Sequence, residues 1–193
     1  MSYKLSITAT AVCFALAGCM GSGDGSNSFS AAEVAQDKAT YDSLVKRVDD
    51  GDLLVAQDPA GTARLAGTMT FDPPEATDNL TVGRLTMDVN FDEQKVSGTA
   101  DQFASYTRDM SQKNMDLKGS LDITGTIDSA SAMTANAHGT VSDDEGSITA
   151  DLQMSGDVYD DSGKYVALGD FTGTGTSSGT TEQFTGTFHA EQQ

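Results

Sequence analysis

The chain has 193 residues, with 29 acidic and 11 basic side chains and a net charge of −18. Phosphate groups repel so acidic a chain, which excludes nucleic-acid binding and weakens any attraction to anionic lipid surfaces. Only 37% of the residues are hydrophobic, a composition that also occurs in disordered chains, but hydrophobic alternation over most of the sequence predicts a folded domain.

Residues 1–18 have the pattern of an export signal. Lys4 supplies the positive start, and the apolar stretch Leu5–Leu16 is shorter than the roughly 20 residues that cross a bilayer. The tetrad Leu16-Ala17-Gly18-Cys19 resembles the lipobox of bacterial lipoproteins. The resemblance implies cleavage before Cys19, a diacylglycerol on its sulfur and an acyl group such as palmitate on the freed amine. An ordinary secretory signal that contains a cysteine is the alternative.

Residues 19–29 are rich in Gly and Ser, which predicts a flexible tether between the lipidated Cys19 and the folded domain. Cys13 leaves with the signal, so no disulfide can form within the mature chain. Met20 directly follows Cys19, at the position where an Asp would favour retention in the inner membrane. The absence of this Asp favours the outer membrane. We therefore expect a lipid-anchored protein of the cell envelope, at the outer membrane, facing the periplasm or the outside.

Residues 30–50 predict one amphipathic helix ahead of the strands. Ser30 followed by Glu33 is a capping-box signature. The apolar side chains on one face recur at helical spacing; they are Val34, Tyr41, Leu44, Val45 and Val48. We expect this helix to pack on the domain that follows, although a helix that binds a partner has the same pattern.

From residue 60 to residue 193 the hydrophobic period is two. Turn signals separate most of the eight alternating segments, which are Ala63–Phe71, Gly83–Phe91, Val96–Ala100, Met115–Ile123, Met133–Val141, Ile148–Val158, Val166–Leu168 and Phe184–Ala190. With no helix between them, neighbouring strands should be antiparallel, with one buried and one wet face.

These features predict an all-β protein, an eight-stranded antiparallel up-and-down β-barrel preceded by the helix. A β-sandwich is the alternative. The mixture of Gly and Ala with Leu, Met and Phe on the buried face suits a narrow interior. The same glycines, with few aromatic residues, argue against an apolar face directed at lipid.

Three stretches resemble the β-barrel domains of transferrin-binding protein B and related surface lipoproteins. They are "MDVNFDEQKVSGTADQF" (Met87–Phe103), "GDFTG" (Gly169–Gly173) and "FTGTFHAEQQ" (Phe184–Gln193). The resemblance covers residues 60–193 and implies the barrel and the lipoprotein lifestyle. The chain departs from the family in lacking its "FYG" motif and a handle domain, so transferrin binding is not inferred.

The sequence offers little chemistry for catalysis. His138 and His189 are the only histidines, and both fall in the solvent-facing register of their strands, so we expect surface side chains. No nucleophile elbow, P-loop or zinc-ligand spacing occurs, and the prediction is a protein without enzymatic activity, metal or cofactor. Tyr106 and Arg108, in the polar segment 105–115, are candidate partner contacts; the alternative is a helical turn over one barrel mouth.

The sequence therefore predicts a non-enzymatic binding or interaction module, its protein partner unknown and its membrane contact made through the lipid. The alternative is a lipocalin-like envelope carrier that holds a small apolar ligand inside the barrel. Bulky Leu, Met and Phe on the inward face favour a filled interior, and a continuous internal cavity above about 300 Å³ would favour the carrier.

Overall fold

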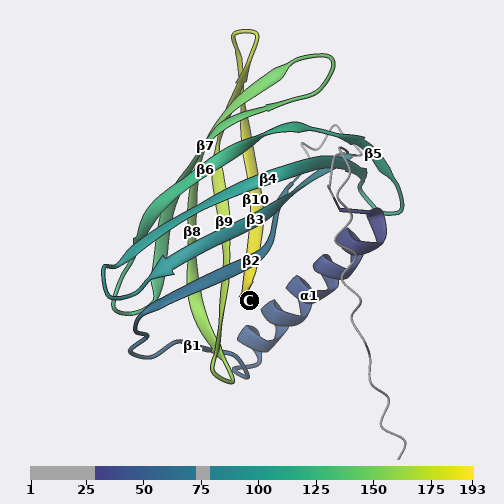
Figure 1. Cartoon of the computed structure of the whole chain (residues 1–193). Coiled ribbons are helices and arrows are strands. Elements are labelled where there is room, and N and C mark those ends of the chain that lie inside the picture. The colour runs from purple at the N-terminus through teal and green to yellow at the C-terminus, as the bar shows by residue number, and fades with distance from the viewer. Residues whose placement is uncertain (1–28, 73–78) are drawn as a thin grey trace, which may run out of the picture.

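The computed structural model describes residues 29–72 and 79–193. Eight long antiparallel strands form a closed barrel, and helix α1 (Ala31–Asp49) lies across the outside of its wall (Figure 1). The predicted all-β barrel preceded by one helix is confirmed. The predicted signal, Cys19 and the tether up to residue 28 lie outside the described residues.

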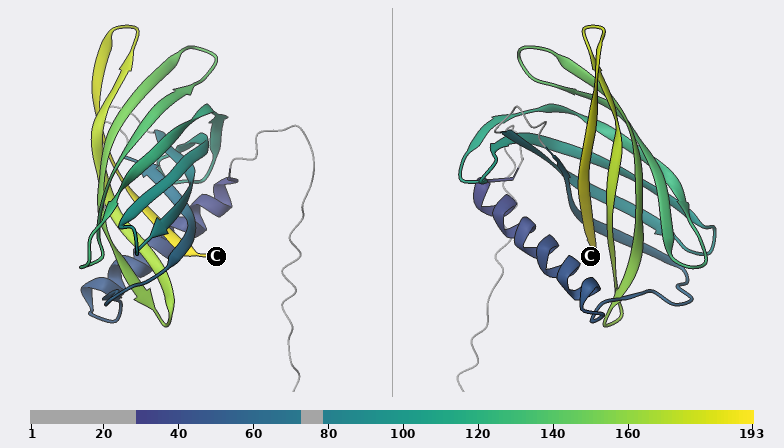
Figure 2. Two further views of the ribbon diagram at one scale, coloured as in Figure 1. Left: turned by 60° about the vertical axis from the view of Figure 1, so that its left-hand side comes forward. Right: turned by 180° about the vertical axis from the view of Figure 1, so that it is seen from behind.

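Each long strand pairs with the next along the chain, and the last pairs with the first. The strands are β2 (Thr62–Phe71), β3 (Asn79–Asn90), β4 (Lys95–Thr107), β6 (Lys118–Ile127), β7 (Ala132–Ser142), β8 (Ser147–Asp161), β9 (Lys164–Ser177) and β10 (Thr180–Gln192). Two short strands are added, β1 (Leu54–Val55) beside β8 and β5 (Lys113–Asp116) beside β4. Closure through β10 and β2 rules out the β-sandwich (Figure 2).

The hydrophobic alternation places most of the predicted side chains inside the barrel on seven of the eight predicted strands. The predicted segment Met115–Ile123 is divided between β5 and β6, and Met115 on β5 is 46% exposed. On the segment Val166–Leu168 the prediction is wrong. Ala167 faces inward, opposite Val158 and Ala190, while its two neighbours pack against the helix outside. A run of three apolar residues carries no period, so the sequence could not indicate which of them faces the interior.

The segment 169–183 forms strand rather than the connection between two short strands that the sequence suggested. Strands β9 and β10 continue through it and meet at the two-residue turn Ser178-Gly179. Both turn residues have positive φ, 49° and 84°, as a type I′ hairpin turn requires.

A β-bulge in β4 changes which side chains face outward. The pairing register with β3 shifts between Val82 and Arg84, and Gln102 on the bulged strand has a φ of 51°. Beyond this point Phe103 points into the barrel, and Tyr106 points out beneath the helix. The bulge thus gives the outer wall an apolar patch.

Helix α1 begins as predicted, with a capping box. The Ser30 hydroxyl accepts a hydrogen bond from the Glu33 N–H, and the Glu33 carboxylate accepts one of 2.7 Å from the Ser30 N–H. The bond from the Ser30 N–H, and one of 2.8 Å that the Ser30 hydroxyl donates to the same carboxylate, lower the pKa of the Glu33 carboxyl. Val34 and Leu44 are the helix residues that become buried against the barrel.

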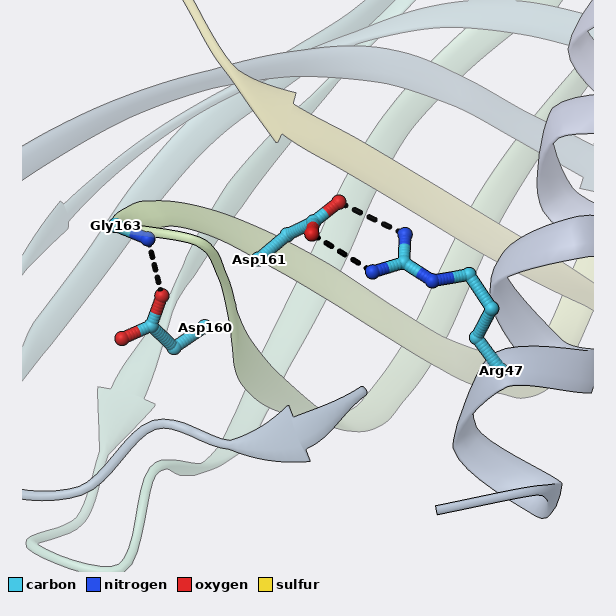
Figure 3. Close-up of polar contacts among 4 residues, drawn as sticks. All are labelled: Arg47, Asp160, Asp161 and Gly163. Carbon is cyan, nitrogen blue, oxygen red and sulfur yellow. Dashed lines mark hydrogen bonds and ion pairs between the residues drawn. The ribbon is translucent and has the colours of Figure 1, made fainter. Parts of the chain in front are cut away.

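Two separate apolar clusters hold the helix to the wall. The first, at its N-terminal end, joins Phe29 and Val34 to side chains of β3 and β4. The second joins Leu44 to Leu53 and to outward side chains of β8 and β9. An ion pair adds to the second, because Arg47 donates hydrogen bonds of 2.8 and 2.7 Å to the Asp161 carboxylate at the β8–β9 turn (Figure 3).

Shortening Leu44 tests whether the helix is an integral part of the fold. Leu44→Ala removes a side chain that is 5% exposed, so the free energy of unfolding should fall by about 2–4 kcal/mol in urea denaturation. Ser43→Ala, at the adjacent exposed position, is the control and should change it by less than about 0.5 kcal/mol. Equal stability of the two variants would show that the helix is not held against the barrel.

Candidate functional site

One end of the barrel holds a cavity of about 600 Å³ that opens to solvent, and we call it the cup. Its walls come from the strand ends and hairpins that gather at that end of the barrel (Figure 1). The lining residues are Phe71, Asp72, Asn79, Thr81, Phe103, Ser105, Met115, Leu117, Leu121, Val141, Ser142, Asp143, Glu145, Gly146, Ser147, Ile148, Ala150, Ser177 and Phe184.

The opposite end of the barrel is filled. The Phe91 and Tyr165 rings lie 4.7 Å apart, and the bulky Ile127 and Met133 are each 1% exposed. The segment before β2 covers this end, where the buried Ser131 hydroxyl donates a hydrogen bond of 2.8 Å to the Ala56 carbonyl. Access to the interior is therefore from the cup end.

Aromatic rings form much of the cup's inner surface. Phe71 makes edge contacts with Phe103, Phe171 and Phe184 at centroid distances of 6.1, 4.8 and 6.1 Å. Glycine leaves the space for these rings, since a Cβ at Gly83 would lie 2.2 Å from the Phe103 ring. The cup is thus a built apolar surface, with its aromatic side chains fixed by one another.

The mouth of the cup is polar and acidic. Asp72, Asp143 and Glu145 line it and are exposed. One Asp143 carboxylate oxygen accepts hydrogen bonds of 2.8 Å from the Glu145 and Gly146 N–H groups, which fixes the β7–β8 turn. Thr185 donates to Asp72 at 3.3 Å. None of these three hydrogen bonds comes from a cationic group, so the mouth is lined by negative charge.

A smaller cavity of about 200 Å³ lies between α1 and the barrel wall, and His189 lines it. The expectation that His189 is a surface side chain is wrong, because it is only 4% exposed. It does face out of the barrel, but the helix covers it: Thr68 Oγ1 lies 3.2 Å from its Nδ1 and the Tyr41 ring 6.0 Å from its own. Burial lowers the pKa of His189 to about 4.

His138 is exposed on β7, as expected, and contacts Asp151 on the adjacent strand. Within residues 29–72 and 79–193, no three His, Cys, Asp or Glu side chains are close enough to bind a metal ion together. The described part of the chain also contains no helix long and apolar enough to cross a membrane.

Tyr106, expected in an exposed loop, is completely buried on β4. Its hydroxyl donates a hydrogen bond of 2.5 Å to the Phe29 carbonyl, and burial raises its pKa to about 12. A side chain held beneath the helix in this way offers no surface to a partner. Arg108 is exposed in the β4–β5 turn, which is a hairpin rather than a helical turn, and its role as a partner contact stays a prediction.

Phe29, placed in the tether by its sequence context, belongs to the folded domain. It is 8% exposed, and the Arg84 guanidinium lies 4.3 Å from the centre of its ring. Its neighbours Leu80 and Tyr106 lie on the outer wall, on the same stretches of β3 and β4 whose inward residues Thr81 and Ser105 line the cup. The described part of the chain therefore begins beside the cup.

Comparison with known proteins gives no match: no family model, no curated protein and no solved structure is significantly similar to this chain. What the cup can do chemically therefore rests on its own residues. They supply apolar contact area and an acidic mouth.

The buried His189 should make stability pH-dependent. Its pKa is about 4 in the folded protein and about 6.5 when unfolded, so the unfolded state binds more protons at acidic pH. Stability present above pH 6.5 is lost as the pH falls to about 4, by up to about 3 kcal/mol.

The measurement is urea denaturation of wild type and His189→Gln across this range. The variant should lose that pH dependence, whereas His138→Gln, at an exposed site, should keep it. Asp37, which lines the same cavity, has a pKa raised by burial, so its effect on the pH dependence of stability has the opposite sign. The contribution of His189 is therefore read from the difference between wild type and His189→Gln. An identical dependence of unfolding free energy on pH in wild type and His189→Gln would contradict the assignment of this dependence to His189.

Proposed function

We propose that this protein is a non-enzymatic binding protein of the bacterial cell envelope, anchored to the outer membrane by lipid on Cys19, and that the cup is its binding site. The observation that carries the proposal is the apolar cavity at the open end of a barrel whose other end is filled. Small-molecule pockets occupy about 300–1,000 Å³ and are mostly apolar with a few polar groups, and the cup has this character.

The cup favours the lipocalin-like carrier over a module that binds only through its outer surface. A filled barrel would have left only the outer surface for recognition. Instead, Phe71, Leu117 and Phe184 are partly buried at the cavity and retain apolar surface toward it. The interior is therefore filled at one end, as the side chains predict, and hollow at the other.

The lipobox resemblance of residues 16–19 supports the anchor. The resemblance to the barrels of transferrin-binding protein B agrees with the fold and with a surface lipoprotein. It supplies no partner, and transferrin binding is not part of the proposal. A partner protein that binds near Arg108 is a second candidate, because the turn that carries this residue is exposed close to the cup.

Filling the cup should abolish binding of an uncharged apolar dye. Nile red should bind the full chain carrying Cys19→Ser, which has no attached lipid to compete, and its fluorescence should rise on binding. Ala150→Phe places a ring in the cavity and Thr81→Trp places one at the mouth, so each should weaken dye binding by about tenfold or more.

Thr124→Trp, at an exposed outward position of β6, is the matched control and should bind the dye like the parent chain. Circular dichroism and thermal unfolding of each variant verify that the barrel is intact. Dye binding that is absent in the parent, or equal in the folded cup variants, would refute the cup as a binding site.

The anchor has its own test. Intact-mass measurement of the protein purified from membranes should show cleavage before Cys19 and a mass excess equal to a diacylglycerol and an acyl chain. Cys19→Ser should abolish the excess and move the protein to the soluble fraction, because two or three acyl chains supply the membrane affinity. Unmodified wild-type protein would contradict the proposal, and protease treatment of intact cells reports which face the domain occupies.

A further inference from the structure

We propose that the ligand of the cup is an amphipathic cation, a small molecule with an apolar body and a protonated amine. The proposal rests on the cup being a binding site and adds the chemical class of its occupant. It follows from where the apolar and the charged groups lie along the depth of the cavity.

The deep part of the cup is apolar. Leu121 and Phe103 are at most 1% exposed, and Ala150 is 5% exposed. Because no charged side chain belongs to this part of the lining, a charge placed there would lose its hydration without gaining a partner. The buried end of the ligand is therefore apolar.

The charged side chains in the described lining of the cup have one sign. Three carboxylates line the cavity, those of Asp72, Asp143 and Glu145, and the described lining contains no Lys, Arg or His. Two lysines lie near lining residues in the sequence, and each faces a carboxylate that does not belong to the lining. Lys113 pairs with Asp116 at 2.5 Å, and Lys118 lies 3.9 Å from Asp144. The mouth therefore attracts a positive head group and repels a negative one.

This arrangement excludes a fatty-acid type of ligand. A carboxylate at the mouth would meet three like charges and no guanidinium or ammonium among the described lining residues. An alcohol would find hydroxyl partners at the rim, such as Thr81 and Ser105, but would gain nothing from the carboxylates. An ammonium group can donate hydrogen bonds to the hydroxyl groups and is attracted by the carboxylates, and cation–π contact with the neighbouring aromatic rings adds to that attraction.

Three probes with the same alkyl chain and different head groups test the inference. Decylammonium, decanol and decanoate are titrated, below their aggregation concentrations and near neutral pH, into Nile red bound to the full chain carrying Cys19→Ser. Decylammonium should displace the dye about tenfold more tightly than decanol, and decanoate should be the weakest. Added salt should reduce the advantage of decylammonium.

Variants locate the preference. The double variant Asp72→Asn/Glu145→Gln should remove most of the tenfold advantage of decylammonium over decanol. Two carboxylates that do not line the cup, on the outward faces of β3 and β6, serve as the matched control: Asp88→Asn/Asp122→Asn should keep the advantage. Butylammonium, with too short an apolar part, should not displace the dye, which excludes attraction to the acidic surface in general.

Decanol or decanoate binding as tightly as decylammonium would overturn the inference while leaving the cup as a binding site. An unchanged advantage in Asp72→Asn/Glu145→Gln would also overturn it. A parent chain that binds neither the dye nor any of the probes would instead overturn the proposed function itself.

Discussion

The interior of an eight-stranded barrel has a nearly fixed width, and the rest of this structure depends on how the chain fills it. At several inward positions a residue without bulk lies beside a large side chain of the adjacent strand. Phe188 is 1% exposed and lies where a Cβ on Gly169 would be 2.7 Å from its ring. Such pairs fill the barrel toward its closed end without forcing the strands apart.

Toward the other end the same constraint is met differently. Phe71, Phe103, Phe171 and Phe184 gather against one another instead of spreading across the interior. The β7–β8 and β9–β10 hairpins project on this side (Figure 2), so the wall rises above the last packed layer. A cavity follows, because four clustered rings cover the wall but do not fill the space that the wall encloses. The hydrophobic pattern of the sequence predicts that Phe71 and Phe184 face inward, but it does not predict that the four rings pack against one another.

The alternation predicted most of the barrel because it is a local property of each strand. It failed where both faces of the wall are apolar. Val166 and Leu168 flank the inward Ala167, and helix α1 buries them from outside, so neither polarity nor period marked the interior face. Tyr106 follows a bulge that no residue type announces, and His189 becomes buried only because α1 crosses β10. These outward-facing side chains all lie on the outer wall beneath the segment that carries the helix, a contact between parts of the chain far apart in sequence that the local pattern does not encode.

The same helix joins the proposed anchor to the proposed site. Phe29 is fixed by the Tyr106 hydroxyl and by the Arg84 guanidinium on the outer wall of the strands that form the cup. Ten peptide units separate Phe29 from Cys19, so covalent geometry limits the distance between their Cα atoms to about 36 Å. A lipid on Cys19 would therefore hold the cup end of the barrel within that distance of its membrane attachment, whereas no such limit acts directly on the filled end, at the far end of α1. An amphipathic cation partitions to the membrane surface, since its chain enters the lipid and its head group meets anionic phosphates. The cup would then meet such a molecule where it is most concentrated, and the acidic mouth would compete with the lipid phosphates for its charge.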